Sequence, residues 1–196
     1  SNLGVRILYG VLNQEPDVWC ERSYAPWPDM EERMRENNIP LYAFESGDPI
    51  SEFDVVAFTL QYELCYSNVL NMLELGGIPL LAAERGENDP IVIGGGPCAY
   101  NAEPVADFFD VFSIGEGEEA LPEFTQLYIK LKSEGADRAT VLREISHLDG
   151  FYVPSLYDVS YNNDGTLASC SPKYPDVPAR VRKRIISDMD SSYFPD

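Results

Sequence analysis

Two short apolar runs, each followed by a glycine-rich stretch, constrain the fold of this chain more than any other feature. Residues 91–93 (Ile-Val-Ile) run into Gly94-Gly95-Gly96-Pro97, and residues 111–114 (Val-Phe-Ser-Ile) run into Gly115-Glu116-Gly117-Glu118-Glu119. Buried strands that end in glycine are typical of the carboxyl edge of an open α/β sheet, where the backbone approaches another group too closely for a Cβ. The pattern therefore predicts a binding domain, and catalysis is a separate question.

The rest of the chain alternates helix-like and strand-like segments, as an α/β fold does. Apolar spacing and first-turn residues predict helices over residues 3–12, 30–37, 66–75, 120–133 and 138–147. Strands are expected over residues 18–23, 41–44, 53–60, 91–93 and 111–114. The run at 53–60 is continuously apolar after Asp54, which is typical of a central parallel strand covered on both faces.

The character of the sequence changes after Gly150. Residues 152–161 alternate, Asn162-Asn163-Asp164-Gly165 is a turn, and residues 166–170 return, so a β-hairpin is expected. The tail is rich in proline and contains the basic cluster Arg180, Arg182, Lys183 and Arg184.

These changes divide the chain into three predicted parts. They are an α/β domain over residues 1–150, a hairpin over 151–171 and a linker over 172–196. An α/β domain usually begins with a strand rather than with the helix expected at residues 3–12. We therefore expect the first strand of the domain to be missing from this sequence, and the linker to lead into a further domain.

The charge balance excludes several classes of partner. The 196 residues include 33 acidic and 14 basic side chains, which gives a net charge of −19. Nucleic-acid surfaces and anionic membranes both require clustered Lys and Arg, so neither partner is expected. No apolar run approaches the ~18 residues of a membrane-spanning helix, and the amino terminus has no secretory pattern.

The cysteines and the single histidine exclude several kinds of site. Cys20, Cys65, Cys98 and Cys170 are scattered, with no C-x-x-C pair, so we interpret them as four buried small hydrophobic residues in a reducing, cytoplasmic compartment. With His147 as the only histidine, neither a catalytic triad nor a His-rich metal site can be built. We therefore expect no catalytic residue and no metal ligand in this chain.

Three groups of residues lie where ligands bind in an open α/β sheet. They are Thr59, Leu60 and Gln61; Gly94, Gly95 and Gly96; and Gly115, Glu116 and Gly117. Each group also has a simpler explanation that needs no ligand. The first can be an ordinary strand-to-helix loop and the second a tight turn. The third can be a helix start, where acidic residues interact favourably with the helix dipole. Neither P-loop nor dinucleotide-binding spacing is present, so a nucleoside triphosphate site is not expected. The carboxylates of the third group favour a neutral or cationic ligand group, or a partner domain.

Taken together, these segments resemble the N-terminal cobalamin-binding-like domain of cobalamin-type radical SAM proteins. The shared order is a strand that ends in Thr59, then Gly94-Gly95-Gly96-Pro97, then an acidic strand that ends in Gly115-Glu116-Gly117-Glu118. In addition, residues 24–30, 80–86 and 177–184 resemble an uncharacterised subfamily of these proteins. The resemblance therefore covers nearly the whole chain.

The resemblance implies a three-layer, flavodoxin-like (Rossmann-like) sheet that caps a downstream radical SAM domain. In that family a C-x-x-x-C-x-x-C motif on the downstream domain binds a [4Fe–4S] cluster that cleaves S-adenosylmethionine. This sequence lacks the motif, so the chain alone is not expected to be catalytic. The resemblance also implies cobalamin, because Thr59, Gly94 and Gly95 match two family landmarks. The Asp-x-His-x-x-Gly motif that coordinates cobalt is absent.

Two alternatives to cobalamin binding stay open. In the first, the chain is a structural cap that docks to its own radical SAM domain or to another protein, with the glycine loops at the interface. In the second, it is a flavodoxin-like module that binds a flavin. Because a missing first strand leaves a sheet edge unpaired, self-association is a further expectation.

Overall fold

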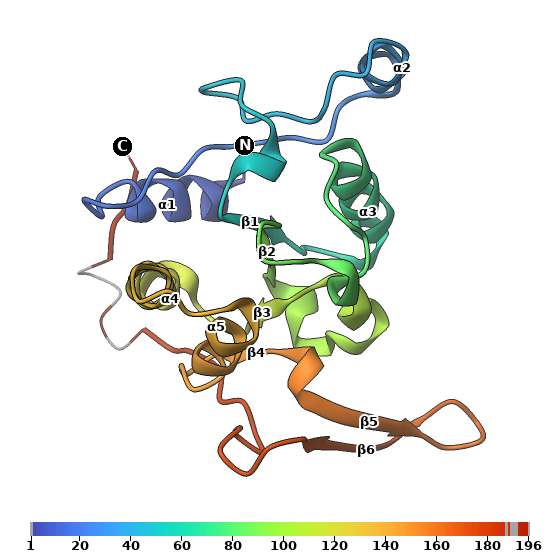
Figure 1. Cartoon of the computed structure of the whole chain (residues 1–196), viewed down its shortest axis with the longest axis vertical. Helices are drawn as coiled ribbons and strands as arrows, with labels where there is room; N and C mark the ends of the chain where they lie inside the picture. The colour runs from blue at the N-terminus through green and yellow to red at the C-terminus, as the bar shows by residue number, and fades with distance from the viewer. Residues whose placement is uncertain (1, 187, 189–191, 196) are drawn as a thin grey trace.

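A four-stranded sheet forms the centre of the molecule, and helices cover both of its faces (Figure 1). The computed structural model describes residues 2–186, 188 and 192–195. The strand order is β1 (Val55–Thr59), β2 (Ile91–Gly95), β3 (Val111–Ser113) and β4 (Phe151–Tyr152). The first three strands are parallel and β4 is antiparallel to β3. The predicted Rossmann-like α/β fold is therefore confirmed.

The sheet centre is formed by β2 and β3, whose apolar residues are buried on both faces. Val92, Val111 and Phe112 have no exposed surface, and burial of each such side chain contributes roughly 1.5–3 kcal/mol. The ring of Phe112 also lies 4.9 Å from that of Phe109. This rigid centre fixes where the loops after β2 and β3 begin.

The helices form two layers against the sheet. Figure 1 shows α3 (Tyr66–Leu75) on one face, and α4 (Gly117–Ser133) and α5 (Arg138–Ile145) on the other. Helix α1 (Leu3–Leu12) packs against α4, and the Asn2 side chain caps it by accepting a hydrogen bond from the Gly4 N–H. Helix α2 (Pro28–Glu36) packs near α3: Met34 is buried in the core, and Arg35 donates to Asn71 and Glu74 of α3. Short 3₁₀ helices connect the elements at Ile50–Glu52, Glu63–Cys65, Ala82–Glu84, Pro97–Asn101, Glu103–Phe108 and Pro154–Leu156.

The strand at residues 53–60 is not central, and that prediction was wrong. Among the described residues, β1 pairs only with β2 and is the edge of the sheet, with residues that are half-buried or exposed. Its apolar composition matches that of β2, so composition alone does not distinguish the two positions.

Two predicted strands are absent from the described part of the chain. Residues 18–23 are extended, but side chains bond their backbone: the Asn13 amide contacts both the N–H and the C=O of Cys20, and Glu45 accepts from the Arg22 N–H. Residues 41–44 form only one isolated bridge, between Tyr42 and Pro49, because the chain turns back within a few residues. Neither segment finds the partner strand that a ladder requires.

The predicted hairpin is present, with a later start. It consists of β5 (Tyr157–Tyr161) and β6 (Leu167–Pro172), which lie apart from the main sheet in Figure 1. Phe151 and Tyr152 belong to β4 of the main sheet instead, because their side chains are buried against its core.

A buried ion cluster closes the amino edge of the sheet. Asp110, directly before β3, is 3% exposed and accepts hydrogen bonds from Arg85 Nη1 and the Val92 N–H, both at 2.8 Å. Arg138 Nη2 lies 2.9 Å from its other oxygen. Arg85 also donates to three backbone carbonyls, at Pro79, Leu80 and Phe108. The cluster anchors the loop before β2 to both central strands.

Candidate functional site

The carboxyl edge of the sheet brings together the ends of β1, β2 and β3, since parallel strands end on the same side. Thr59 and Gln61 are exposed there, and Gln61 Nε2 donates to Thr59 Oγ1 at 2.6 Å. Leu60 between them is fully buried, and its N–H donates to the Gly95 carbonyl at 2.6 Å. Leu60 therefore joins β1 to β2, and its two neighbours face outward.

The three consecutive glycines serve different purposes. Gly94 and Gly95 continue β2, so the predicted loop begins only at Gly96. A Cβ at Gly94 would lie 3.0 Å from the side chains of Leu60 and Phe112, and one at Gly96 would lie 3.1 Å from the Leu60 carbonyl oxygen. Gly96 also has a φ of 94°, a conformation that favours glycine. These two positions are explained by packing within the chain, whereas a Cβ at Gly95 would meet nothing closer than 3.8 Å.

The loop after β3 receives the chain's own C-terminal segment. Residues 181–186, which we call the strap, cross the carboxyl end of β3, where Arg184 forms a parallel bridge with Gly115. The Arg184 N–H donates to Ile114 at 2.8 Å, and the Glu116 N–H donates to Arg184 at 3.2 Å. A Cβ at Gly115 would lie 2.6 Å from the Arg184 nitrogen, and the Gly115 φ is 111°. Glycine at this position therefore admits the strap.

Charged contacts reinforce the strap. The Arg184 guanidinium pairs with Glu119 at 3.0 Å and Glu123 at 2.5 Å, both on the first turns of α4. Hydrogen bonding to Glu123, followed by that to Glu119, raises the pKa of Arg184 above its usual value. The Glu116 carboxylate accepts a hydrogen bond from the Ile186 N–H. The acidic residues after Gly115 thus bind a basic segment of the same chain.

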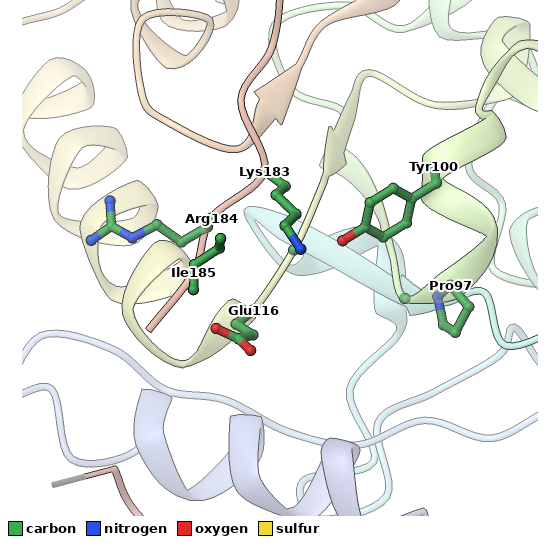
Figure 2. A pocket seen from close by; sticks show the side chains of 8 residues that line it. Pro97, Tyr100, Glu116, Lys183, Arg184 and Ile185 are labelled. Carbon is green, nitrogen blue, oxygen red and sulfur yellow. The ribbon is translucent and has the colours of Figure 1, made fainter. Parts of the chain in front are cut away.

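A pocket of about 400 Å³ lies between the ends of β2 and β3 and the strap (Figure 2). Its lining consists of Gly96, Pro97, Tyr100, Gly115, Glu116, Lys183, Arg184 and Ile185. Figure 2 shows the Lys183 and Tyr100 side chains pointing toward one another across it, whereas the Arg184 guanidinium points away toward α4. The pocket therefore offers an ammonium and a phenol at one end and the Glu116 carboxylate at the other.

The structure brings only some of the predicted site residues together. Gly96, Gly115 and Glu116 line the pocket, whereas Gly94 and Gly95 lie within β2 and Gly117 begins α4 beside Leu8. The strap residues and Tyr100 were missed. The sequence signal that could have revealed the strap is the basic cluster at residues 180–184. In so acidic a chain, a basic segment is expected to pair with acidic residues of the same molecule.

No metal-binding cluster of His, Cys, Asp and Glu is present in the part of the chain that the structure describes. The four cysteines are free thiols, but only Cys98 is buried, and Cys170 is exposed on the hairpin. The prediction of four buried cysteines was therefore wrong: Cys20 and Cys65 are half-buried, and Cys170 lies on β6, whose first five residues are exposed. Within the described residues, no helix combines the length and apolar character needed to cross a membrane.

Comparisons with known proteins give a family match over most of the chain. A family model described as "Radical SAM proteins, N-terminal" matches residues 4–154. Over 89 residues the chain is 37% identical to the uncharacterized protein MJ0966 of Methanocaldococcus jannaschii, an alignment that covers 44% of this chain and 18% of that protein. No solved structure matches the chain.

Proposed function

Because this chain belongs to the family of N-terminal regions of radical SAM proteins, we propose that it is an accessory domain that docks through its carboxyl edge onto a downstream radical SAM domain. The downstream domain would bind the [4Fe–4S] cluster and S-adenosylmethionine, since the C-x-x-x-C-x-x-C motif is absent from this sequence. The accessory domain would then position and cover that catalytic domain without supplying a catalytic residue.

The path of the chain after β6 is the observation that carries this proposal. Ile186, the last residue of the strap, is buried beside Glu116 at the carboxyl edge. Farther along, the Tyr193 ring lies against Gly10 of α1, and Leu8 of the same helix lies against Gly117 at the start of α4. A domain joined after these residues would therefore lie on the side of the carboxyl edge, because the Asp110 cluster closes the opposite edge.

Exposed apolar side chains near the same edge also favour docking. Tyr62, Leu64 and Tyr100 lie in the loops after β1 and β2 and are 58%, 84% and 60% exposed. Large apolar side chains that are this exposed favour an interface. Burying them against a second domain would stabilise the pair by the hydrophobic effect. Trp19, Trp27 and Phe44, at 77%, 81% and 69%, leave further apolar surface in another part of the chain.

The division of labour is tested by reconstituting the longer protein and the 196-residue chain with iron and sulfide in parallel. We expect the longer protein to hold a [4Fe–4S] cluster and to cleave S-adenosylmethionine under reducing conditions, and the chain alone to do neither. Iron content and 5′-deoxyadenosine formation are the two measurements. A longer protein that binds no cluster would contradict the proposal.

Cobalamin binding at the carboxyl edge is a second candidate function. It is favoured by the open backbone at the ends of β1 and β2, where Thr59 is exposed beside its register partner Gly95. The pocket does not fit a corrin while the strap is docked. Its 400 Å³ lies near the lower end of the ~300–1,000 Å³ typical for drug-sized ligands, and a corrin cofactor is larger than these. No Asp-x-His-x-x-Gly histidine is present to coordinate cobalt.

A titration with hydroxocobalamin tests this candidate directly. Because the strap fills the end of β3, we expect the corrin absorption bands to stay unshifted when the chain is added at high micromolar concentration. A saturable spectral shift that Gly95→Phe abolishes and Gly86→Phe leaves intact would instead establish cobalamin binding. Gly86 suits as the control, because it is exposed in the loop before β2 and a Cβ there would meet only the Asp89 carboxylate, at 3.8 Å. The same titration with flavin mononucleotide, followed by flavin fluorescence, tests the flavin alternative.

A further inference from the structure

The strap forms one wall of the pocket, and this shared construction carries a further inference. Lys183, Arg184 and Ile185 contribute to the lining, opposite Gly96, Pro97 and Tyr100. Without the strap the same space would be an open surface at the ends of β2 and β3. Docking of the strap and closure of the pocket are therefore one event.

The two ends of the strap are apolar and packed, whereas its middle is held by polar contacts. Val181 packs against the hydrophobic core and Ile186 is 6% exposed. The strap backbone makes the two hydrogen bonds of the Gly115–Arg184 bridge and the bond from Ile186 to Glu116. The Arg184 side chain is 21% exposed, and its partners Glu119 and Glu123 are 46% and 44% exposed. Ion pairs with this exposure are weakened by salt and contribute little individually. Around Arg184 the attachment is thus weaker than the packing of the sheet, and Val181 and Ile186 are the strap side chains that add apolar burial.

We propose that the strap is a displaceable closure of the carboxyl edge, held in place by Arg184 and released without unfolding of the sheet. Glycine at positions 115 and 150 fits this role, because both have positive φ and both approach the strap. A Cβ at Gly150 would lie 3.1 Å from that of Arg184. The groove therefore fits the backbone of the strap closely.

Release of the strap would have two consequences at the same place. The Ile114 carbonyl, the Glu116 N–H and the carboxylates of Glu119 and Glu123 would become available to another partner. A ligand bound in the pocket would favour the docked state, because it gains the wall that Lys183 and Ile185 provide. If the proposed function holds, the same equilibrium also sets how firmly a downstream domain is oriented.

Amide hydrogen exchange of the 196-residue chain, followed residue by residue by NMR, tests the proposal. The Glu116 N–H reports on the strap because it bonds Arg184, and the Phe112 N–H in β3 reports on the sheet. We expect Arg184→Gln to accelerate exchange at Glu116 by up to roughly tenfold, because the two weak pairs with Glu119 and Glu123 are lost together, and to leave Phe112 unchanged. Salt should accelerate exchange at Glu116 in the native chain for the same reason.

Matched variants separate the strap from general charge effects. Arg182→Gln removes the same charge from an exposed strap residue for which no ion pair is seen in the described structure, so exchange at Glu116 should stay as in the native chain. The double change Glu119→Gln and Glu123→Gln should reproduce the effect of Arg184→Gln from the opposite side, and Glu118→Gln should not.

Two outcomes would overturn the proposal. In the first, Arg184→Gln and the double glutamate variant leave exchange at Glu116 as slow as in the native chain. In the second, Glu116 and Phe112 accelerate together, which would make the strap an integral part of the sheet. Both readouts use only this chain, so the proposal can fail while the proposed function stands, and the reverse.

Discussion

Asp110 is the residue on which the amino edge of the sheet depends. Its carboxylate is buried and contacts two arginines and one backbone N–H. A buried charge is tolerated only when it is fully paired, because its desolvation otherwise costs several kcal/mol. The arginines have the same requirement, since Arg85 has no exposed side-chain surface.

Removal of this charge is expected to destabilise the fold strongly. Asp110→Asn leaves Arg85 and Arg138 without their carboxylate, and the loss of one partner from a buried pair costs about 3–5 kcal/mol. Denaturant unfolding measures the difference. Asp107→Asn is the matched control, because Asp107 is exposed on the 3₁₀ helix just before Asp110, and its cost should stay within about 0.5 kcal/mol. Equal stability of the two variants would show that the cluster does not stabilise the fold.

Arg184 is the corresponding residue at the carboxyl edge, where solvent changes the balance. Its pairs with Glu119 and Glu123 are half in water, so their loss should release a segment rather than unfold the domain. The two ion clusters thus differ in burial: the Asp110 cluster is buried and stabilises the fold, whereas the Arg184 pairs are half-exposed and hold only the strap.

At the scale of elements, the sequence predicted the central strands and the main helices well. β2 and β3 are short, buried and mostly apolar and run into glycine, and α4 shows acidic residues in its first turn and lysines in its last. These signals are local, so they survive in any tertiary context. The hairpin was predicted for the same reason, from a turn at Asn162-Asn163-Asp164-Gly165.

The elements that were predicted wrongly depend on partners far away in the chain. β1 has the composition of a central strand and lies at the edge, where it pairs with β2 alone among the described residues. Residues 18–23 have strand character, but Asn13 and Glu45 bond their backbone. No local pattern reports which segment occupies a neighbouring position. Self-association through the β1 edge stays a prediction.

The candidate site was predicted in part, and the reason lies in its glycines. Glycine marks a close approach but does not say what approaches. At Gly96 the neighbour is Leu60, and at Gly115 it is Arg184, so the chain itself explains positions that suggested a ligand. Gly95 is the member of the group that packing leaves unexplained.

At the scale of the whole molecule, the amino and carboxyl edges of the sheet differ in how their charged residues are arranged. The net charge is −19, yet three basic residues of the strap, Arg182, Lys183 and Arg184, lie at the carboxyl edge. They offset the acidic start of α4 and allow a chain segment to cross it. In the loops after β1 and β2, Tyr62, Leu64 and Tyr100 stay exposed, and these are the side chains that the proposed docking would bury.

The central claim is that this carboxyl edge faces the downstream radical SAM domain. Hydrogen exchange measured on the longer protein and on the 196-residue chain tests it most directly, because each backbone segment reports its own burial. We expect the longer protein to protect residues 61–65 and 96–101 at the carboxyl edge, and to leave residues 86–90 and 134–137 at the amino edge unchanged. Protection confined to the amino-edge segments, or to neither edge, would contradict the account.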